Sequence, residues 1–231
     1  MSVHRSPDGK IVRIGRVEQR KSWSAAFETA LPPWLAVQVG AAVAFAPASS
    51  STESANARFA AASAGGAIRF WAGGPGTPIG DIIPVNYDEI EFSLYGLRFD
   101  TTAGWNVNIG IGNTTNDRGV MLIHDDSGTT ESTAFFRGYA AAPNFIDTPT
   151  PYQIQKPNGS QKPRNISLIW RPQRNEAFIL EDDQVMAYVD GLPTPGASMA
   201  WGHKAMVTFT ATDGGTHNIK VNRVDIALRH N

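Results

Sequence analysis

The sequence predicts an all-β fold, a sandwich of two antiparallel sheets, and three features of its 231 residues support this. Apolar and polar residues alternate in short runs, as they do in strands with one buried face. Glycine (22 residues) and proline (15 residues) separate these runs, and charged residues make up only 18% of the chain. This balance favours short strands and turns over helices, and the length suits one sandwich domain. We therefore expect one domain over residues 23–231, preceded by an arm over residues 1–22.

The composition argues against several kinds of site and partner. The chain has no cysteine, so it can form no disulfide, thiolate nucleophile or cysteine-ligated zinc site. Its five histidines are scattered, and we expect neither a metal site nor a cofactor. A formal net charge of -1 does not favour attraction of the whole surface to nucleic acid. No stretch approaches the roughly 18 apolar residues of a membrane span.

The N-terminal arm differs from the rest of the chain in its charge, which is positive by four. Its basic residues are Arg5, Lys10, Arg13, Arg16, Arg20 and Lys21. One interpretation is an edge strand that these charges protect from unwanted pairing. Another is a docking arm that adds a strand to the sheet of another protein chain, or of a second copy. Nucleic-acid binding is the weakest interpretation, because no aromatic residue lies between the basic ones.

Residues 165–192 predict three consecutive strands. Ile166, Leu168 and Trp170 alternate as a half-buried strand does, a polar turn follows, and the chain returns as a hairpin. A third apolar run ends at Asp190-Gly191, where a turn with positive φ is easily made. We expect the aromatic residues of these strands to line the inner face of the sandwich. They are Trp170, Phe178 and Tyr188.

Two segments resemble the concanavalin A-like family of legume lectins and glucanases. One is the strand with Ile169-Trp170, followed by a turn, a strand and a final Tyr188-Val189-Asp190-Gly191. The other runs from Trp23 through Phe27 and a Leu-Pro turn to Trp34. The resemblance implies a jelly-roll sandwich whose first and last strands are neighbours.

Residues 85–96 carry the pattern on which an enzyme hypothesis depends. The segment Asp88-Glu89-Ile90-Glu91-Phe92-Ser93 resembles the catalytic strand of family 16 glycoside hydrolases, in which alternate carboxylates flank a sugar bond. The resemblance implies that Glu89 stands at the nucleophile position and Glu91 at the assisting position. Ser93 stands at the acid/base position of this pattern, and a serine hydroxyl cannot protonate the leaving glycosidic oxygen.

The alternative interpretation of this strand is structural. Glu89, Glu91 and Ser93 would form its solvent side, while Ile90, Phe92 and Leu94 pack inward. The same polar face is compatible with a groove that binds carbohydrate without cleaving it. For such a groove the candidate ligand-binding residues are Tyr87, Glu89, Glu91, Ser93, Trp105, Asn106 and Asn108.

A proline-rich connection is expected over residues 139–162, where Tyr139, Phe145 and Tyr152 are a second candidate contact surface. For the whole chain we expect a non-catalytic binding or assembly module. We expect it in a bacteriophage virion, as a tail, fibre or decoration protein, with other virion proteins or a host-surface glycan as partners. Alternatives are a family 16-like hydrolase acting on a surface polysaccharide, and a purely structural domain. Outside a virion the expectation is cytoplasmic synthesis, since the N-terminus lacks the apolar run of a secretory signal.

Overall fold

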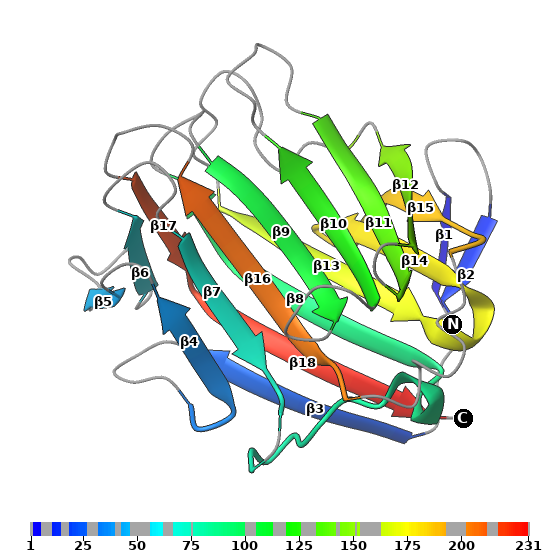
Figure 1. The fold of residues 1–231 in the computed structure, drawn as a ribbon, viewed down its shortest axis with the longest axis horizontal. Coiled ribbons are helices and arrows are strands. Elements are labelled where there is room, and N and C mark those ends of the chain that lie inside the picture. Colours follow the sequence, from blue (N-terminus) through cyan, green and yellow to red (C-terminus); the bar gives the residue numbers. More distant parts are fainter. Residues whose placement is uncertain are drawn as a thin grey trace.

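A computed structural model of the chain shows two β-sheets lying one behind the other (Figure 1). The structure describes residues 2–5, 11–14, 19–26, 32–39, 43–46, 56–61, 67–74, 76–99, 105–112, 119–125, 133–141, 144–150, 152, 163–192, 202–211 and 217–230. Within these residues the fold class predicted from the sequence is confirmed: the chain is a jelly-roll sandwich of antiparallel sheets.

The sheet nearer the viewer in Figure 1, which we call the front sheet, has seven strands, all paired antiparallel. In spatial order they are β12 (Asn144–Thr150), β11 (Thr133–Ala141), β10 (Gly119–Asp125), β9 (Trp105–Gly112), β16 (Lys204–Ala211), β7 (Ala67–Ala72) and β4 (Leu35–Val39). Because β16 lies between β9 and β7, the centre of this sheet joins segments that are distant in the sequence.

The sheet behind it, which we call the back sheet, has nine strands. One path through it runs β15 (Gln184–Val189), β14 (Glu176–Glu181), β13 (Arg164–Arg171), β8 (Glu89–Phe99), β17 (His217–Val221), β6 (Asn56–Ala61) and β5 (Val43–Ala46). Beside the first part of β8 lies β18 (Arg223–His230), which also pairs with β3 (Gln19–Ala26). The first long strand is thus the neighbour of the last, as the family resemblance implied.

The core lies between the two sheets and is built from alternate residues of their strands. On β8 the inward side chains are Ile90, Phe92 and Leu94, all fully buried, as the sequence predicted. On β9 they are Val107, Ile109 and Ile111. Burying such side chains removes apolar surface from water, which is the dominant stabilising contribution in a chain without disulfides.

The three strands predicted over residues 165–192 are β13, β14 and β15, joined by the single-turn helix η2 (Pro172–Arg174) and a two-residue turn. The prediction for their aromatic residues is correct for Trp170, which packs inward, and wrong for the other two. Phe178 and Tyr188 belong to a second cluster on the outer side of the sheet. The register explains this, because Ala177 and Ile179 take the inward positions of β14.

The connection predicted over residues 139–162 is also partly wrong. Strand β12 occupies Asn144–Thr150 and pairs with β11, so Phe145 and Tyr139 lie opposite each other in a ladder. Tyr152 is buried in the core, and this burial raises the pKa of its hydroxyl. The adjacent apolar residues Phe145 and Ile146 inside a proline-rich stretch were sufficient for an edge strand, where the missing N–H of Pro149 is tolerated.

Candidate functional site

The candidate site residues lie on two opposite surfaces of the sandwich. Glu89, Glu91 and Ser93 belong to β8 of the back sheet, and Asn106 and Asn108 belong to β9 of the front sheet. The inward side chains of both strands meet in the core between them. We call the outer surface of the back sheet the back face, and that of the front sheet the front face. The structure therefore does not bring the two sets of residues together.

Glu89 is the centre of a network of ion pairs on the back face. Its Oε2 accepts a hydrogen bond from Arg171 Nε at 2.9 Å, and its Oε1 accepts one from Arg229 Nη1. Arg229 Nη2 also donates to Glu91 at 2.7 Å, and Arg171 Nη1 lies 3.5 Å from Glu176. The antiparallel register places these side chains in adjacent positions on β14, β13, β8 and β18. Both oxygens of Glu89 are thus held by guanidinium groups.

The expectation that Glu89, Glu91 and Ser93 form a solvated surface is wrong for two of the three. The alternation is as predicted, but Glu89 is only 2% exposed and Ser93 only 1%. Ser93 Oγ lies 2.7 Å from Ser167 Oγ and 3.1 Å from Glu91 Oε1, so its partners are protein atoms. Cross-strand neighbours supply contacts that water would otherwise make. No carboxylate of this strand faces an open groove in the way a glycosidase requires.

Tyr87 lies at the end of the sandwich, where the single-turn helix η1 (Pro84–Asn86) leads into β8. Its ring is half-buried against the core, and the ring centroid is 4.6 Å from that of His230. This burial raises the pKa of the Tyr87 hydroxyl. The residue packs next to the last strand and is not part of the front face.

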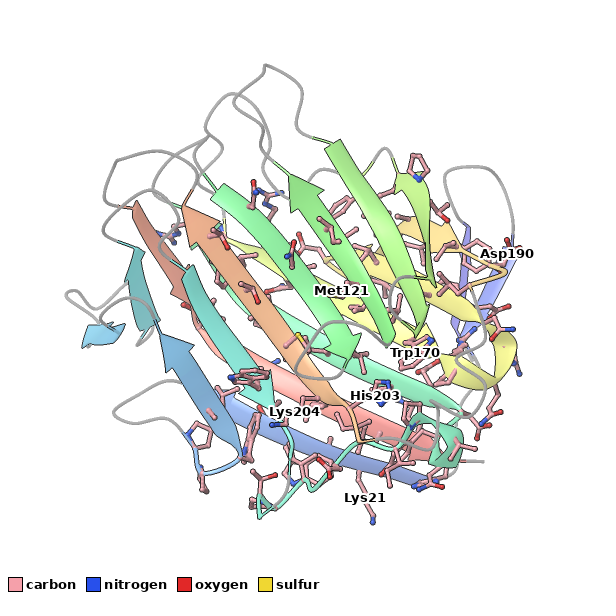
Figure 2. The ribbon with its side chains drawn as sticks, in the orientation of Figure 1. Lys21, Met121, Trp170, Asp190, His203 and Lys204 are labelled. Carbon is pink, nitrogen blue, oxygen red and sulfur yellow. The ribbon has the colours of Figure 1, made fainter. Side chains whose placement is uncertain are left out.

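The front face has two adjacent rows of side chains across its central strands. In the first row, Met206 of β16 lies opposite Trp71 of β7 on one side and Gly110 of β9 on the other, and Gly110 lies opposite Met121 of β10. Figure 2 shows Met121 on this sheet. Met206 and Met121 are 0% and 3% exposed. This row is apolar.

The second row of the front face is polar. Thr208 of β16 lies opposite Asn108 of β9, and Asn108 lies opposite Ile123 of β10. The side-chain oxygen of Asn108, Oδ1, is buried and has no hydrogen-bond partner among the described residues. Asn106, two positions earlier on the same strand, lies opposite Thr210. Trp105 begins β9, but its side chain is outside the part of the chain that the structure describes.

Two glycines shape the front face by leaving room for longer side chains. A Cβ on Gly110 would lie 2.5 Å from Met121 Cγ, so only glycine lets this methionine lie across β9. A Cβ on Gly74, whose φ is +114°, would lie 2.8 Å from Lys204 Cε. Lys204 Nζ is 5.1 Å from the ring centroid of Trp71, within the range of a cation–π contact. The sequence analysis did not select these residues, although the alternation Lys204, Met206, Thr208 contained the signal.

The predicted docking residues belong to three different elements. Arg5 is in β1 (Ser2–Arg5) and Arg13 in β2 (Ile11–Ile14), which pair only with each other among the described strands. Arg20 and Lys21 are in β3, an outer strand of the back sheet, where Lys21 is exposed and points away from the molecule (Figure 2). The remaining two, Lys10 and Arg16, lie outside the described residues.

No group of three or more histidine, aspartate or glutamate side chains that could hold a metal ion occurs among the described residues. Asp182 and Asp183 form a turn with positive φ between β14 and β15, and Asp182 Oδ1 accepts a hydrogen bond from Asn165 Nδ2 at 3.0 Å. Within the described residues, no helix is long and apolar enough to cross a membrane.

No protein-family model and no curated protein matches this sequence. Many solved structures are nevertheless similar in fold. The carbohydrate recognition domain of Emp47p is similar with a TM-score of 0.59 at 11% identity, covering 90% of this chain and 95% of that one. The exoplasmic/lumenal domain of VIP36, bound to Ca²⁺ and Man3GlcNAc, is similar with a TM-score of 0.56 at 9% identity, covering 88% and 86%.

The binding domain of botulinum neurotoxin DC, in complex with rat synaptotagmin II, is similar with a TM-score of 0.53 at 13% identity. The match covers 83% of this chain and 43% of the toxin chain, so only part of the toxin binding domain corresponds to it. At these identities the likeness shows the fold alone, a concanavalin A-like jelly roll, and the function has to be argued from the side chains.

Proposed function

We propose that this chain is a non-catalytic binding module whose front face takes a carbohydrate. The proposal rests mainly on Asn108, whose side-chain oxygen is buried and unpartnered beside Thr208. A buried polar atom without a partner costs roughly 1–3 kcal/mol. A hydroxyl group bound after the Asn108 side chain turns outward would remove that cost. In the adjacent apolar row Met206 and Met121 are buried, and the half-buried Trp71 supplies a ring on which a sugar can pack, so the two rows together have the mixed character of a sugar site.

The similar structures support the same class of ligand. The similar part of Emp47p is its carbohydrate recognition domain, and the domain of VIP36 was solved with Man3GlcNAc bound. The synaptotagmin complex of the toxin domain supports a protein partner as the second possibility on this fold. The amide of Asn108 and the hydroxyl of Thr208 favour the carbohydrate, because sugar hydroxyls match both as donors and as acceptors.

The geometry of the back face argues against the hydrolase alternative. A retaining glycosidase needs one carboxylate to attack the sugar and another to transfer the proton. Glu89 is buried and bonded to Arg171 and Arg229, and Glu91 is bonded to Arg229. The residue at the acid/base position, Ser93, is buried next to Ser167. A sugar could reach these groups only after the ion pairs had been broken.

Screening the purified chain against a broad glycan array tests the proposal, followed by calorimetric titration of the best ligand. We expect binding, and we expect Asn108→Ala to weaken it by about tenfold to a hundredfold, the size of a lost buried hydrogen bond. Ser93→Ala on the back face is the matched control, because it also removes one small polar group from a central strand. It should bind like the unmodified chain.

Two results would contradict the proposal. A blank array with a folded chain would favour the purely structural domain. Release of reducing ends from a polysaccharide, abolished by Glu89→Gln, would favour the hydrolase.

The setting we propose for this module is a phage virion, as a tail, fibre or decoration component. The absence of cysteine supports this setting, since such a chain needs no oxidising conditions to fold, and the basic N-terminal residues offer charges for docking on another virion protein. Finding the chain in purified particles by mass spectrometry would test it.

A further inference from the structure

A lysine side chain lies beside the apolar row of the front face, at the start of β16. Figure 2 shows Lys204 on this sheet, and its ammonium nitrogen Nζ is 5.1 Å from the ring centroid of Trp71. The side chain is half-buried, and a Cβ on Gly74 would lie 2.8 Å from its Cε and 3.1 Å from its Nζ. The stem of Lys204 thus lies over Gly74 and the ammonium group over Trp71, which gives this side chain a defined place.

The ammonium group of Lys204 is not neutralised by a carboxylate. In the described part of the chain Lys204 forms no salt bridge, and its ammonium group contacts the Trp71 ring. The exposed Asp81 lies beside Gly202, but no ion pair joins it to Lys204. Fixing a lysine costs side-chain entropy, and a ligand that binds a lysine already in place does not have to supply that cost.

The strands around Lys204 carry basic residues and no acidic ones. Strands β4, β7, β16 and β9 lie side by side and together contain two basic residues and no aspartate or glutamate. The second basic residue is Arg69 of β7, which the register places opposite Thr208, in the row that contains Asn108. This part of the front face therefore favours a ligand that carries negative charge.

The distance between Lys204 and the polar row sets the size of the ligand. Lys204 and Thr208 are four positions apart on β16, which is about 14 Å along a strand. The ammonium group lies near Trp71 of β7, whereas Asn108 is on β9, on the other side of β16. A ligand that contacts both Asn108 and Lys204 must therefore extend over more than one sugar ring.

We propose that the carbohydrate bound on the front face is an oligosaccharide with an acidic sugar, whose carboxylate or sulfate group binds Lys204. This inference rests on the proposed function and adds the chemical class of its ligand. One sugar lies at the polar row of Asn108 and Thr208, and the acidic sugar lies at the Trp71 ring. The ammonium group of lysine is a compact point charge, so it binds either kind of anion.

A glycan array built from matched sets tests this inference. Each set contains a neutral oligosaccharide that ends in a hexose, its counterpart that ends in the corresponding hexuronic acid, and its counterpart with a sulfated hexose. The set that binds best is then titrated by calorimetry with the full chain. We expect an acidic member to bind about fivefold to thirtyfold more tightly than the neutral one, the size of one hydrogen bond to a charged group. This preference should shrink when salt is raised from about 50 mM to about 500 mM.

Three substitutions separate the role of Lys204 from the charge of the chain as a whole. Lys204→Met keeps an unbranched stem over Gly74 and removes the charge, so it should bind the acidic member no more tightly than the neutral one. Lys204→Arg restores a cation and should restore the preference. Lys21→Met is the matched control, because it removes the same charge from an exposed residue of β3 in the back sheet, and it should keep the full preference.

The outcomes separate this inference from the carbohydrate proposal. Equal binding of the neutral and acidic members would overturn the inference and leave the carbohydrate proposal in place. A preference for the acidic member that persists in Lys204→Met would do the same. If the folded chain binds no member of any set, both the carbohydrate proposal and this inference are overturned.

Discussion

The two outer faces of the sandwich both carry polar side chains on their central strands, but the acceptor groups of these side chains have different surroundings. On the back face Glu89 has both oxygens bonded to arginine, and Ser93 lies against Ser167. On the front face the side-chain oxygen of Asn108 is buried and has no hydrogen-bond partner in the part of the chain that the structure describes. The back-face carboxylates are thus bonded to neighbouring arginines, although Arg229 Nε is also buried without a hydrogen-bond partner among the described residues. On the front face the unpartnered atom is an acceptor, which the proposed carbohydrate would satisfy.

This difference shows why carboxylates that alternate along a strand do not by themselves indicate catalysis. A catalytic carboxylate needs contact with the substrate and a proton that it can exchange. In this chain Glu89 and Glu91 instead join strands β13, β8 and β18, because guanidinium groups lie on the neighbouring strands. Their surroundings decide which of the two roles they have.

The largest expected effect is the loss of an arginine from the back-face network. Arg229→Met leaves the buried Glu89 with one guanidinium group and Glu91 with none, and it should lower the free energy of unfolding by about 3–5 kcal/mol. Arg223→Met on the same strand is the matched control. The side chains of its pair with Asp225 are 43% and 22% exposed, and together with the contact of Arg223 to the Tyr95 ring this pair should contribute about 1 kcal/mol.

Urea denaturation of the two variants measures this difference directly. Equal losses in the two variants would show that the back-face network is not a closed structural unit. The back-face ion pairs would then not be a stabilising network, and the contrast with the front face would not hold.

A smaller effect is expected on the front face, at the glycine under Met121. Gly110→Ala brings a Cβ to 2.5 Å from Met121 Cγ and 3.1 Å from the carbonyl oxygen of Val120, and should cost about 1–2 kcal/mol through overpacking. In a Met121→Ala background the main clash is absent, so the same substitution should cost much less. A double-mutant cycle of unfolding free energies gives this coupling. Additive costs would mean that Met121 does not lie across β9 as described.

Much of the fold could be predicted from the sequence, because it depends on local patterns. Alternation identified β8, β9 and β13, and the turn at Asp190-Gly191 ended β15 where expected. The inward positions Ile90, Phe92 and Leu94 followed from the same period of two. A family resemblance at both ends of the chain correctly made β3 and β18 neighbours.

The surroundings of the candidate site could not be predicted, because they depend on pairing between distant segments. Arg171 and Arg229 are 82 and 140 positions away from Glu89, and neither differs in the sequence from an ordinary surface arginine. The placement of Phe178 outside the core depends on the register of β14 against β13 and β15, which a run of four apolar residues leaves open.

The most direct test of the contrast between the faces is a nuclear magnetic resonance titration of the labelled chain with the glycan that binds it. We predict that the largest shifts occur on the front face, at the side-chain amide of Asn108 and the backbone amides of Thr208 and Gly110, while Glu89 and Arg229 stay unchanged. Shifts centred on Glu89, Glu91 and Arg229, with β9 and β16 silent, would contradict the account.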